Sequence, residues 1–576
     1  MLDKFEIARA LREIGQLLEL KGENAFKVKA YDNGAEALEN MADDLGQTVE
    51  ERRLTNLRGI GEALAAKISE LYQTGRCEFL EELRAQMPPG VLELSQIPGL
   101  STKKIQALQS ALNITSIGEL QMACKAGLVA GVPGFGKKTE EKILAGIQTY
   151  ERREDRVLLL DAQAIGEKII AYLKENGVEK AELAGSLRRW QETIGDINVV
   201  VLADDAQAAL DTFENFPAVT KLEERTADSA RVRLASGIRA DVLVASKATW
   251  FAALHQRTGS AGHYDGLKAL AKGLGIQLSE HGIGRQGKLV GINSENDIYE
   301  VLGLPYVPPE LREDIGEIEK ALKGESFDDL ISIEDVQGMV HCHSTFSDGR
   351  NSVEEMVMEA ERLGMKYITM TDHSPSAHYA GGLDDNKMQK QWQEIARVQQ
   401  KVKLKILRGT ESDILEDGSL DYSDKILNEL DIVIASVHSR MKMDEDEMTK
   451  RLVACMKKEQ FKIWGHALGR LVLKREPFKC RVEEVLDAIA ESRAAVEING
   501  DPYRLDMEPK WLRKARERGI KFVISVDAHS VQDLHNLRFG IHMARRAGIR
   551  KEEVLNTLPL EEFMAKVKPA APASVS

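Results

Sequence analysis

The stretches Val340-His341-Cys342-His343 and Val526-Asp527-Ala528-His529 share one pattern, in which two side chains able to bind a metal alternate with apolar residues. In a β-strand, side chains two positions apart point to the same side, so each stretch can direct two ligands at one point. Imidazole nitrogens and carboxylate oxygens together suit Zn, Mn or Fe. The two stretches therefore predict a metal site built at strand ends.

Four further polar residues between these stretches follow the same rule, because each stands at or just past the end of a short apolar run. They are His373 after residues 367–370, Glu411 after 405–407, His438 after 432–435 and His466 after 461–464, while the run 522–525 precedes Asp527. Helix-like segments such as 353–363 and 482–492 separate the runs. Strand, ligand and helix in repetition predict a parallel α/β barrel with its chemistry at the strands' C-terminal ends.

A single buried histidine is usually a hydrogen-bonded core residue, and that reading would suffice for any one of these. Six histidines at successive strand ends, with Asp348, Glu411 and Asp527 among them, favour a metal site instead.

The composition sets outer limits. A chain of 576 residues is too long for one hydrophobic core and predicts roughly three to five domains. Hydrophobic content of 43% and charged content of 30% are ordinary for a soluble protein, and no run of 18 apolar residues predicts a membrane span. Five scattered cysteines without a CxxC pair favour a reducing compartment, so we expect a cytoplasmic protein. The net charge of −14 means that any contact with DNA must be local.

Three stretches near the N-terminus place an apolar residue and a glycine turn before a helix. They are Leu57-Arg58-Gly59-Ile60-Gly61, Ile97-Pro98-Gly99-Leu100-Ser101 and Val132-Pro133-Gly134-Phe135-Gly136. One copy would be ordinary turn punctuation, but three copies predict helix-hairpin-helix elements. In these elements backbone N–H groups and the helix dipole contact a DNA phosphate without reading base sequence. The predicted DNA-binding glycines are Gly59, Gly61, Gly99, Gly134 and Gly136.

Residues 131–137 also fit the spacing G-x-x-x-x-G-K of a nucleotide-binding P-loop. The next residue is Lys138, where a P-loop needs Ser or Thr, and no strand-like run precedes the motif. We therefore reject a nucleoside-triphosphatase site.

The middle of the chain has the features of a nucleotidyl-transfer site. A Gly185-Ser186 turn followed by two arginines suits a triphosphate, and Asp196 opens the next strand-like run. Acids at positions i and i+2 of such a strand hold Mg in two-metal enzymes, and a third acid, Asp241, lies on another predicted strand. The residue at i+2, however, is Asn198.

On these motifs residues 1 to about 315 resemble the family X DNA polymerases, and residues from about 335 to 570 resemble a PHP (polymerase and histidinol phosphatase) domain. The resemblance covers nearly the whole chain. It implies a multidomain α/β protein: a helical helix-hairpin-helix region, a nucleotidyltransferase palm and thumb of the α+β class, and a PHP barrel of the (β/α)7 type. The implied boundaries are 1–84 (lyase-like), 85–152 (fingers), 153–250 (palm), 251–318 (thumb), 319–336 (linker), 337–568 (PHP) and 569–576 (disordered tail).

For the palm and thumb, the resemblance implies that Ser186, Arg189, Gly195 and Gly259 contact the nucleotide. Asp196 and Asp241 would bind catalytic Mg or Mn, with Asn198 in the third catalytic position. Lys67 falls where the lyase branch of the family places a Schiff-base lysine. The sequence departs from the family pattern at Asn198 and also at Gln256, Arg257, Tyr264 and Lys268, in and around the same pocket. Losing one of three carboxylates should cost roughly three orders of magnitude in rate.

For the PHP domain the resemblance implies nine ligands and up to three Mn or Zn ions, with Glu411 shared between two of them. His341, His343 and Asp527 would complete the first site, His438 and His466 the second, and Asp348, His373 and His529 the third. The implied reaction is hydrolysis of phosphodiesters, as a 3′→5′ exonuclease on DNA. Arg440, Lys366 and Arg504 are candidates for phosphate contacts.

Four functions are open at this point. The first is a DNA-repair enzyme, acting in base excision repair, whose PHP nuclease works on gapped DNA, nicked DNA or 3′ ends and whose polymerase site is impaired. The second is a bifunctional polymerase and exonuclease that tolerates Asn198 and also takes a deoxynucleoside triphosphate. The third is a DNA-binding scaffold, and the fourth is a small-molecule phosphatase. We expect a monomer with no membrane partner.

Overall fold

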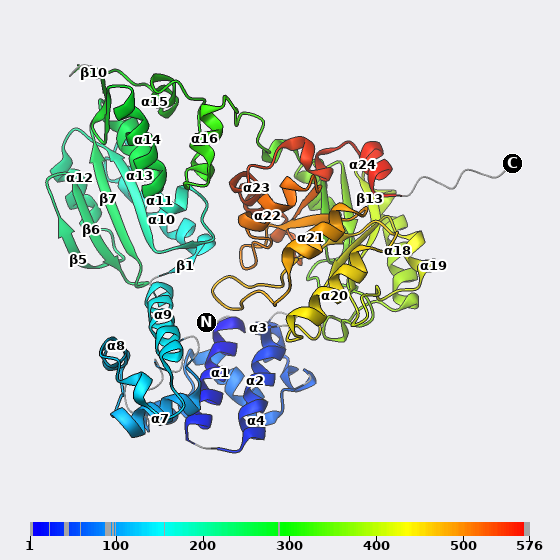
Figure 1. The fold of residues 1–576 in the computed structure, drawn as a ribbon. Coiled ribbons are helices and arrows are strands. Elements are labelled where there is room, and N and C mark those ends of the chain that lie inside the picture. The colour runs from blue at the N-terminus through cyan, green and yellow to red at the C-terminus, as the bar shows by residue number, and fades with distance from the viewer. Residues whose placement is uncertain are drawn as a thin grey trace. The chain divides into compact units, whose positions relative to one another are not determined.

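The computed structural model describes residues 4–21, 23–39, 45–57, 59–86, 94, 97, 100–154, 156–285 and 288–568. The chain divides into two compact units, Met1–Glu154 with His378–Gly381, and Asp155–Ala377 with Gly382–Ser576. The ribbon in Figure 1 follows the chain from the blue helices of the first unit to the red helices of the second. Gly99 and the expected tail 569–576 lie outside the described residues.

The first unit is helical in its described part, as predicted. Its α-helices are α1 (Lys4–Leu20), α2 (Ala25–Glu39), α3 (Leu45–Glu50), α4 (Glu62–Thr74), α5 (Glu78–Ala85), α7 (Thr102–Leu112), α8 (Ile117–Lys125) and α9 (Lys137–Glu154). The apolar stripe of α1 is buried, with Leu11 and Ile14 fully covered. Two hydrophobic cores form, one around α1 and α4 and one around α7 and α9. No helix in the described residues is long and apolar enough to span a membrane.

Each of the three predicted hairpins is closed by a hydrogen bond of the same type. In each, the backbone N–H of a buried apolar residue donates to the carbonyl three positions earlier: Ile60 to Leu57 at 3.0 Å, Leu100 to Ile97 at 3.1 Å and Phe135 to Val132 at 2.9 Å. A helix follows each turn, α4, α7 and α9. The repeated sequence motif is therefore also a repeat in the structure. A short 3-10 turn, Val129–Gly131, stands where a P-loop would need a strand, which agrees with the rejection of a nucleotide-binding P-loop.

The palm is a five-stranded sheet in the order β2-β4-β7-β6-β5. Its strands are β2 (Lys180–Leu183), β4 (Asp196–Leu202), β5 (Val219–Arg225), β6 (Ser229–Leu234) and β7 (Arg239–Ala245), and a separate pair is formed by β1 (Val157–Leu158) and β3 (Thr193–Ile194). Helices α10 (Leu159–Glu175), α11 (Gly185–Arg188) and α12 (Ala206–Glu214) accompany it. Strands β4 and β7 run parallel at the centre of the sheet, which places their polar side chains side by side.

The thumb combines helices with a small antiparallel sheet. It contains α13 (Trp250–Thr258), α14 (Ala261–Gly273), β8 (Ile276–Ser279), β9 (Gly282–Arg285), β10 (Lys288–Val290), α15 (Glu295–Val301) and the 3-10 turn η3 (Pro309–Leu311). Helix α16 (Glu317–Leu322) and the 3-10 turn η4 (Ile333–Asp335) lead into the C-terminal region.

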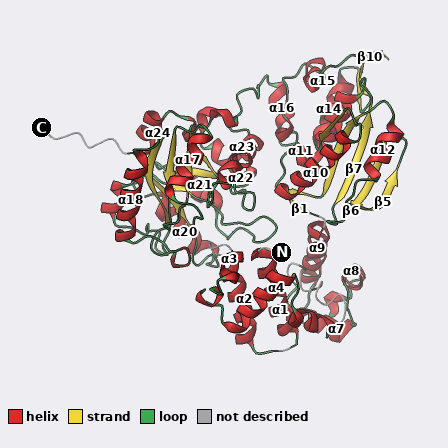
Figure 2. Ribbon diagram, turned by 180° about the vertical axis from the view of Figure 1, so that it is seen from behind, coloured by secondary structure: helices red, strands yellow, loops and turns green. Residues whose placement is uncertain are grey.

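The C-terminal region is a seven-stranded parallel barrel, in the sequential order β11 to β17. Its strands are β11 (Gly338–Cys342), β12 (Tyr367–Met370), β13 (Lys405–Asp413), β14 (Ile432–Ser436), β15 (Ile463–Trp464), β16 (Ala495–Asn499) and β17 (Phe522–Ser525). The helices are α17 (Val353–Arg362), α18 (Asp385–Gln399), α19 (Asp424–Glu429), α20 (Glu445–Met456), α21 (Val482–Ala490), α22 (Pro509–Glu517), α23 (Leu537–Arg546) and α24 (Leu560–Val567). Figure 2 shows helices such as α17, α18 and α21 around these strands.

The barrel closes between its first and last strands in two places. At the C-terminal end, the N–H of His343 donates to the Ala528 carbonyl at 2.8 Å, and the N–H of Ala528 donates to the His341 carbonyl at 3.1 Å. Near the start of the strands the buried Asn556, in the 3-10 turn η8 (Leu555–Thr557), bridges the gap. Its amide donates to the Gly338 carbonyl at 2.9 Å and the Ile524 carbonyl at 2.8 Å, and its oxygen accepts the Ile524 N–H at 3.0 Å.

The predicted apolar runs are confirmed as the strands β12, β13, β14, β15 and β17, although some of these strands begin or end at other residues than predicted. Strand β13 continues to Asp413, so Glu411 lies within the strand, whereas β15 is limited to two residues. The sequence analysis did not identify β16, whose five residues are all buried. Its interior glutamate, Glu497, interrupted the apolar run by which the other strands were recognised.

We predict that Asn556→Leu lowers the free energy of unfolding of the full-length chain by about 3 kcal/mol, because it removes three buried hydrogen bonds and leaves their backbone partners unpaired. Guanidinium unfolding measures the change. The exposed Asn386, in the first turn of α18, supplies the control Asn386→Leu. A loss no larger than that of the control would show that the Asn556 amide does not hold the barrel closed.

Candidate metal centre and palm site

The barrel brings all nine predicted ligands to the C-terminal ends of its strands. His341 belongs to β11 and Glu411 to β13, while the others stand on the loops that follow the strands. Most of them are buried, and His529, with 31% of its side chain exposed, is the most open. The candidate metal centre is therefore an enclosed polar cluster that opens at His529. Three groups of its atoms lie close enough to hold an ion: His341, His343, Glu411 and Asp527; His373, Glu411 and His438; and His343, Asp348, His373 and His529.

The first group has the dimensions of a tetrahedral site. His341 Nε2 lies 3.4 Å from Asp527 Oδ1 and 3.4 Å from Glu411 Oε2. His343 Nε2 lies 3.3 Å and 3.5 Å from the same two oxygens. Four ligands bound at 2.0 to 2.2 Å to a tetrahedral ion stand about 3.3 to 3.6 Å apart. The spacing of the four atoms therefore fits one divalent cation at their centre.

The hydrogen bonding of these atoms supports the same fit. His341 Nε2, His343 Nε2, Glu411 Oε2 and Asp527 Oδ1 are buried and have no hydrogen-bond partner among the described residues. Buried polar atoms normally find a partner, because an unpaired one costs about 1 to 3 kcal/mol. Four such atoms facing one another are the arrangement expected of ligands rather than of core residues.

Glu411 belongs to two of the three groups and contacts His373, which is a member of the third. Its Oε1 lies 2.7 Å from His466 Nε2 and 3.2 Å from His438 Nε2, and its Oε2 lies 3.2 Å from His373 Nδ1. On the far side of His373, the Asp348 Oδ2 atom lies 3.3 Å from His373 Nε2 and 3.4 Å from His529 Nε2. The geometry agrees with a shared Glu411, and it adds His343 to the third group, because His343 Nδ1 lies 3.5 Å from Asp348 Oδ1. In the second group it places His373, where the sequence predicted His466, beside Glu411 and His438.

The three carboxylates are ionised in spite of their burial. Burial by itself raises the pKa of a carboxyl group, but the surrounding imidazoles hold the pKa values of Glu411, Asp348 and Asp527 well below their ordinary range. The three carboxylates are therefore available as anionic ligands at neutral pH, and a divalent cation would take the place of the protons that the neighbouring imidazoles otherwise hold.

A second layer of residues, which the sequence analysis did not identify, orients the histidines. Glu497 accepts a hydrogen bond from His341 Nδ1 at 2.5 Å and also from the backbone N–H of His466. Asp413 accepts one from His438 Nδ1 at 2.9 Å. His529 Nδ1 donates to the carbonyl of Asp527 at 2.8 Å. The contacts to Nδ1 of His341, His438 and His529 fix those rings so that Nε2 faces the cluster, which is how proteins orient metal-binding histidines.

The palm places its predicted acids together as well. In the parallel register Asn198 of β4 stands directly beside Asp241 of β7, and Asp196 lies two positions before Asn198 on the same face. Asp196 also contributes to a raised pKa of the Asp241 carboxyl, although burial is the larger cause. The two aspartates and Asn198 therefore form one polar site.

Two neighbours alter this palm site. Arg231 on β6 donates from Nε to Asp241 Oδ1 at 2.7 Å, so a protein cation already occupies one oxygen of the third acid. Gly185 has a φ of +61°, and a Cβ there would lie 2.8 Å from Asn198 Nδ2, so the glycine turn packs directly on the asparagine. Arg231 was not among the sequence-predicted residues.

The predicted nucleotide contacts surround the same site. Ser186 belongs to α11, Gly195 lies between β3 and β4, and Gly259 ends α13. Arg189 donates to Glu313 Oε1 at 2.6 Å and to the Thr258 carbonyl at 2.7 Å. Of the residues that depart from the family pattern, Tyr264 is buried in the thumb core.

Four models of known domain families match the chain in the regions where these sites lie, and two of them are helix-hairpin-helix families. Helix-hairpin-helix models match residues 3–77, 49–113 and 91–149, the DNA polymerase beta thumb matches residues 253–313, and the PHP domain matches residues 340–501. The DNA polymerase/3′-5′ exonuclease PolX of Bacillus subtilis (strain 168) is 33% identical over 98% of the chain and 100% of its own length. The chain belongs to the family X DNA polymerases that carry a PHP domain.

More distant relatives match one half of the chain or the other. DNA polymerase lambda of Rattus norvegicus is 25% identical over 45% of this chain and 48% of its own length. A probable phosphatase of Thermoanaerobacter sp. (strain X514) is 31% identical over 38% of this chain and 89% of its own length. Polymerases and PHP domains of this family are metal-dependent, in agreement with the clusters described above.

In the helix-hairpin-helix region of this PolX-family chain, the structure describes four of the five predicted DNA-binding glycines, and they lie where the hairpins turn. Gly59 and Gly134 have φ values of +98° and +86°, and Gly61 caps α4. A Cβ at Gly61, Gly134 or Gly136 would meet no atom within 4 Å, so the backbone there is open to a ligand. Lys67 is half-buried on α4, donates to the Ala63 carbonyl at 3.4 Å and lies 4.8 Å from the centre of the Phe79 ring. Its lyase role stays a prediction.

The three arginine and lysine candidates for phosphate contacts differ in position. Arg504 Nε lies 3.3 Å from Asp527 Oδ2, at the metal centre. Arg440 is exposed and pairs with Glu416. Lys366 precedes β12 and so stands at the opposite end of that strand from His373, which does not support its predicted role.

We predict that Glu497→Gln weakens binding of Mn²⁺ or Zn²⁺ by the full-length chain about 10- to 100-fold, because the His341 ring loses the carboxylate that orients it. Competition with a chromogenic chelator measures the affinity. Glu484→Gln, on the exposed side of α21, is the control. Equal affinities in the two variants would contradict the role given to Glu497.

Proposed function

We propose that this protein is a cytoplasmic DNA-repair enzyme that acts on gapped or nicked DNA in base excision repair. Its PHP centre is a metal-dependent 3′→5′ exonuclease, and its palm is impaired as a polymerase. One contrast supports the proposal most directly. Eight of the nine proposed ligands of the PHP centre form three groups and the ninth, His466, contacts Glu411, whereas the palm lacks one of its three acids and has a second engaged by Arg231.

The PHP centre has the parts that phosphodiester hydrolysis needs. Divalent ions bound there would supply a hydroxide near neutral pH and neutralise charge on the attacked phosphate. Asp348, His373 and His529 stand on the more exposed side of the centre, where a substrate phosphate could approach. Arg504, with 20% of its side chain exposed, is a cation next to Asp527 and can contact that phosphate. We assign Mn or Zn to this centre and Mg or Mn to the palm.

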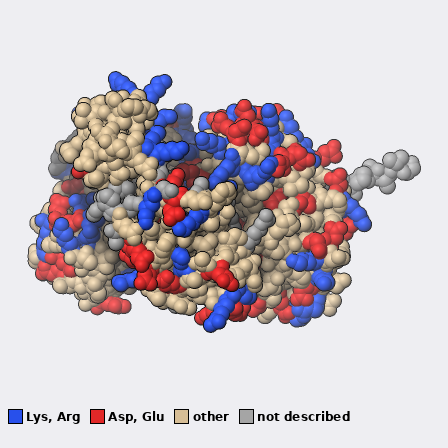
Figure 3. Space-filling model, turned by 90° about the horizontal axis from the view of Figure 1, so that it is seen from below, with Lys and Arg blue, Asp and Glu red and all other residues tan. Residues whose placement is uncertain are grey.

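The choice of DNA as substrate rests on the other half of the molecule. Three hairpins, two of which have open glycine backbone at Gly61, Gly134 and Gly136, would provide contacts to DNA phosphates without base specificity, which suits a repair protein that meets any sequence. Figure 3 shows lysine and arginine side chains interspersed with acidic ones on the face in view, consistent with local DNA contacts on a chain of net charge −14. We propose that the chain binds DNA as a monomer.

The impairment of the palm rests on charge. A two-metal site holds two cations and a polyphosphate, so its carboxylates must supply the balancing negative charge. Asn198 supplies none, and the Arg231 guanidinium at 2.7 Å neutralises part of the charge of Asp241. Arg189, the proposed phosphate ligand, is held by Glu313 and must leave it to bind a nucleotide.

A second candidate is a bifunctional polymerase and exonuclease in which Asn198 is tolerated and a deoxynucleoside triphosphate binds at Ser186, Arg189, Gly195 and Gly259. The name of the Bacillus subtilis relative favours this reading, as do the two retained acids, Asp196 and Asp241, which lie on the neighbouring strands β4 and β7 and interact electrostatically. A phosphatase acting on small monoesters is the third, because relatives of the PHP half carry that name. The attached hairpin region favours DNA over a small molecule.

We predict that the full-length chain with Mn²⁺ shortens a 5′-labelled primer on gapped DNA, and that dNTPs do not reverse the shortening. His341→Ala should lose at least about 100-fold of this activity, since one ligand of the first group is removed, while its DNA affinity stays unchanged. Gel analysis and fluorescence anisotropy measure the two quantities, and His281→Ala, at an exposed thumb histidine, is the control.

Three outcomes would contradict the impaired polymerase, the DNA substrate or the separation of the two sites. Extension of the primer by even one nucleotide would establish the bifunctional enzyme. Release of phosphate from a monoester, with intact DNA, would establish the phosphatase. Loss of DNA affinity in His341→Ala would show that the metal centre and the DNA-binding surface are not separate.

We predict that Asn198→Asp raises primer extension with Mn²⁺ by at least about tenfold, because it restores a charge beside Asp241. Asn215→Asp, at the end of α12, is the control for an added charge on the palm. An unchanged rate of extension would show that Arg231, Gln256 or Arg257 limits the site instead of Asn198.

A further inference from the structure

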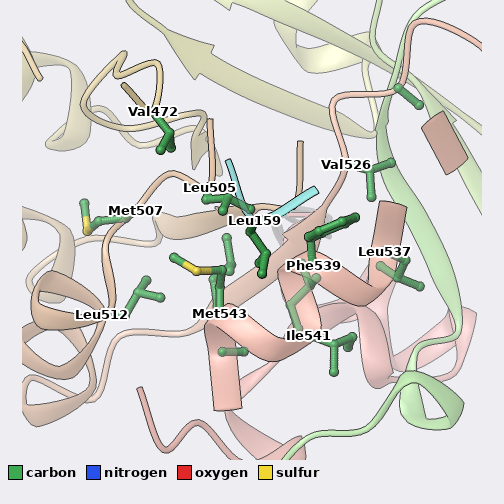
Figure 4. Packing of buried hydrophobic residues seen from close by; sticks show 14 of the residues in the cluster. Leu159, Val472, Leu505, Met507, Leu512, Val526, Leu537, Phe539, Ile541 and Met543 are labelled. Carbon is green, nitrogen blue, oxygen red and sulfur yellow. The ribbon is translucent and has the colours of Figure 1, made fainter. Parts of the chain in front are cut away.

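The palm and the barrel share a hydrophobic core at the edge of the palm. Strands β1 and β3 pair there, and the N–H of Leu159, which follows β1, donates to the carbonyl of Glu192 at 3.2 Å. Figure 4 shows the Leu159 side chain among Leu505, Phe539 and Met543 of the barrel. The segment that ends in Glu192 is therefore held against the barrel by packing.

The residues just before Glu192 strengthen this contact. Trp190 adopts a φ of +57°, a conformation that side chains rarely take, and its ring stacks on His542 of α23 at 3.6 Å between centroids and 9° between planes. Gln191 Oε1 accepts a hydrogen bond from Arg546 Nη2 at 2.9 Å. This segment follows directly on the turn with Ser186 and Arg189, so the proposed nucleotide turn is continuous with the palm–barrel contact.

Glu192 is the charged centre of the contact. It pairs with Arg470 Nη2 at 2.9 Å and lies 3.7 Å from Arg546 Nη1. Only 8% of the Arg470 side chain and 21% of the Glu192 side chain are exposed. Burial opposes the charge on Glu192, but Arg470 and Arg546 hold its pKa below the ordinary value, so the ion pair is present at neutral pH.

On the barrel side, Arg470 fastens two loops of the metal centre to each other. It lies in the loop that begins with the ligand His466, and its Nε donates to the carbonyl of Arg504 at 3.0 Å. Its Nη2 donates to the carbonyl of Leu505, and its backbone N–H donates to Asp506 Oδ2 at 3.3 Å. The position of the loop with Arg504 therefore depends on Arg470.

Arg504 connects this loop to the ligands. Its Nε lies 3.3 Å from Asp527 Oδ2, while Asp527 Oδ1 faces His341 and His343. A continuous series of contacts thus runs from Glu192 of the palm through Arg470 and Arg504 to Asp527. Because each of these residues is packed against or hydrogen-bonded to the next, we expect that displacement of Glu192 would loosen the contact between Arg504 and Asp527.

We propose that Glu192 and Arg470 are positioning residues for the PHP centre, and that the palm thereby holds Arg504 in place beside Asp527 and the substrate phosphate. This inference rests on the proposed exonuclease function for its catalytic consequence, but not for the loop contacts themselves. In this arrangement the palm contributes to nuclease activity through a contact outside its own nucleotide site.

The test compares Glu192→Gln, Arg470→Gln and the double variant with Glu310→Gln in the full-length chain. Glu310 is a matched control, because it too is buried and joins the thumb to α23, through His542 at 2.8 Å and Arg545 at 2.7 Å, without touching the Arg504 loop. The rate of amide hydrogen exchange in residues 501–508 measures how firmly the loop is held. Exonuclease kinetics with Mn²⁺ measure the effect on catalysis.

We expect Glu192→Gln and Arg470→Gln each to speed exchange of residues 501–508 about fivefold and to lower exonuclease kcat/KM about tenfold, the scale of a small misplacement in a site. The double variant should lose no more than Arg470→Gln, because the two residues act as one unit. Glu310→Gln should change neither quantity by more than about twofold.

The outcomes separate the inference from the proposed function. Exchange in Glu192→Gln equal to that in Glu310→Gln would overturn the inference, as would faster exchange with an unchanged kcat/KM. If the unmodified chain degrades no DNA, the proposed function fails, and exchange of the 501–508 segment alone decides whether Glu192 positions the loop.

Discussion

Charges buried at the end of the barrel must neutralise one another, and much of the C-terminal half of the molecule is arranged around that requirement. Three carboxylates and six imidazoles share one space, and a carboxylate taken out of water is stable only with a cation or donors close by. The requirement continues outward, since Glu497 and Asp413 stand behind His341 and His438. Arg504 in turn faces Asp527. A parallel barrel suits this arrangement because every strand ends at the same rim.

The ligands of this centre could be predicted from the sequence because they occupy strand ends, where an apolar run gives way to a polar residue. The second layer could not. Glu497 lies in the middle of β16 and interrupts the apolar pattern by which that strand could have been recognised. Asp413 lies at the end of β13, the strand whose predicted ligand was Glu411. Asn556 stands outside the strands altogether, so no strand pattern points to it. Residues that support ligands are recognised only once the chain is folded around them.

The palm shows a similar limit. Asp196, Asn198 and Asp241 were found from their strands, and the register places them together as expected. Arg231 was missed because its contact depends on which residue of β6 lies opposite Asp241, and that register is set by the turn between β6 and β7. The hairpins near the N-terminus were predictable because each is a local motif, closed by a hydrogen bond within four residues.

The palm and the PHP domain differ in how closely the stability of the fold depends on the polar residues of the site. Along β4 the side chains alternate, so Val199 and Val201 fill the core while Asp196 and Asn198 face the site. Changes on the polar face leave the apolar face intact, and the sheet keeps its stability. In the PHP centre the polar residues are themselves buried, so loss of one would leave the buried charges of its neighbours less well balanced as well as removing a ligand.

The closure of the barrel by Asn556 has a consequence for how the protein is made. The first strand, β11, and its ligand His341 emerge from the ribosome more than 200 residues before the amide that joins Gly338 to Ile524. Until residue 556 has been made, the two edges of the sheet lack the bridge between Gly338 and Ile524, and only the hydrogen bonds between Ala528 and residues 341 and 343 can join them. The complete centre therefore forms late relative to its first strand, and the nascent barrel must keep two open edges protected until the last strand arrives.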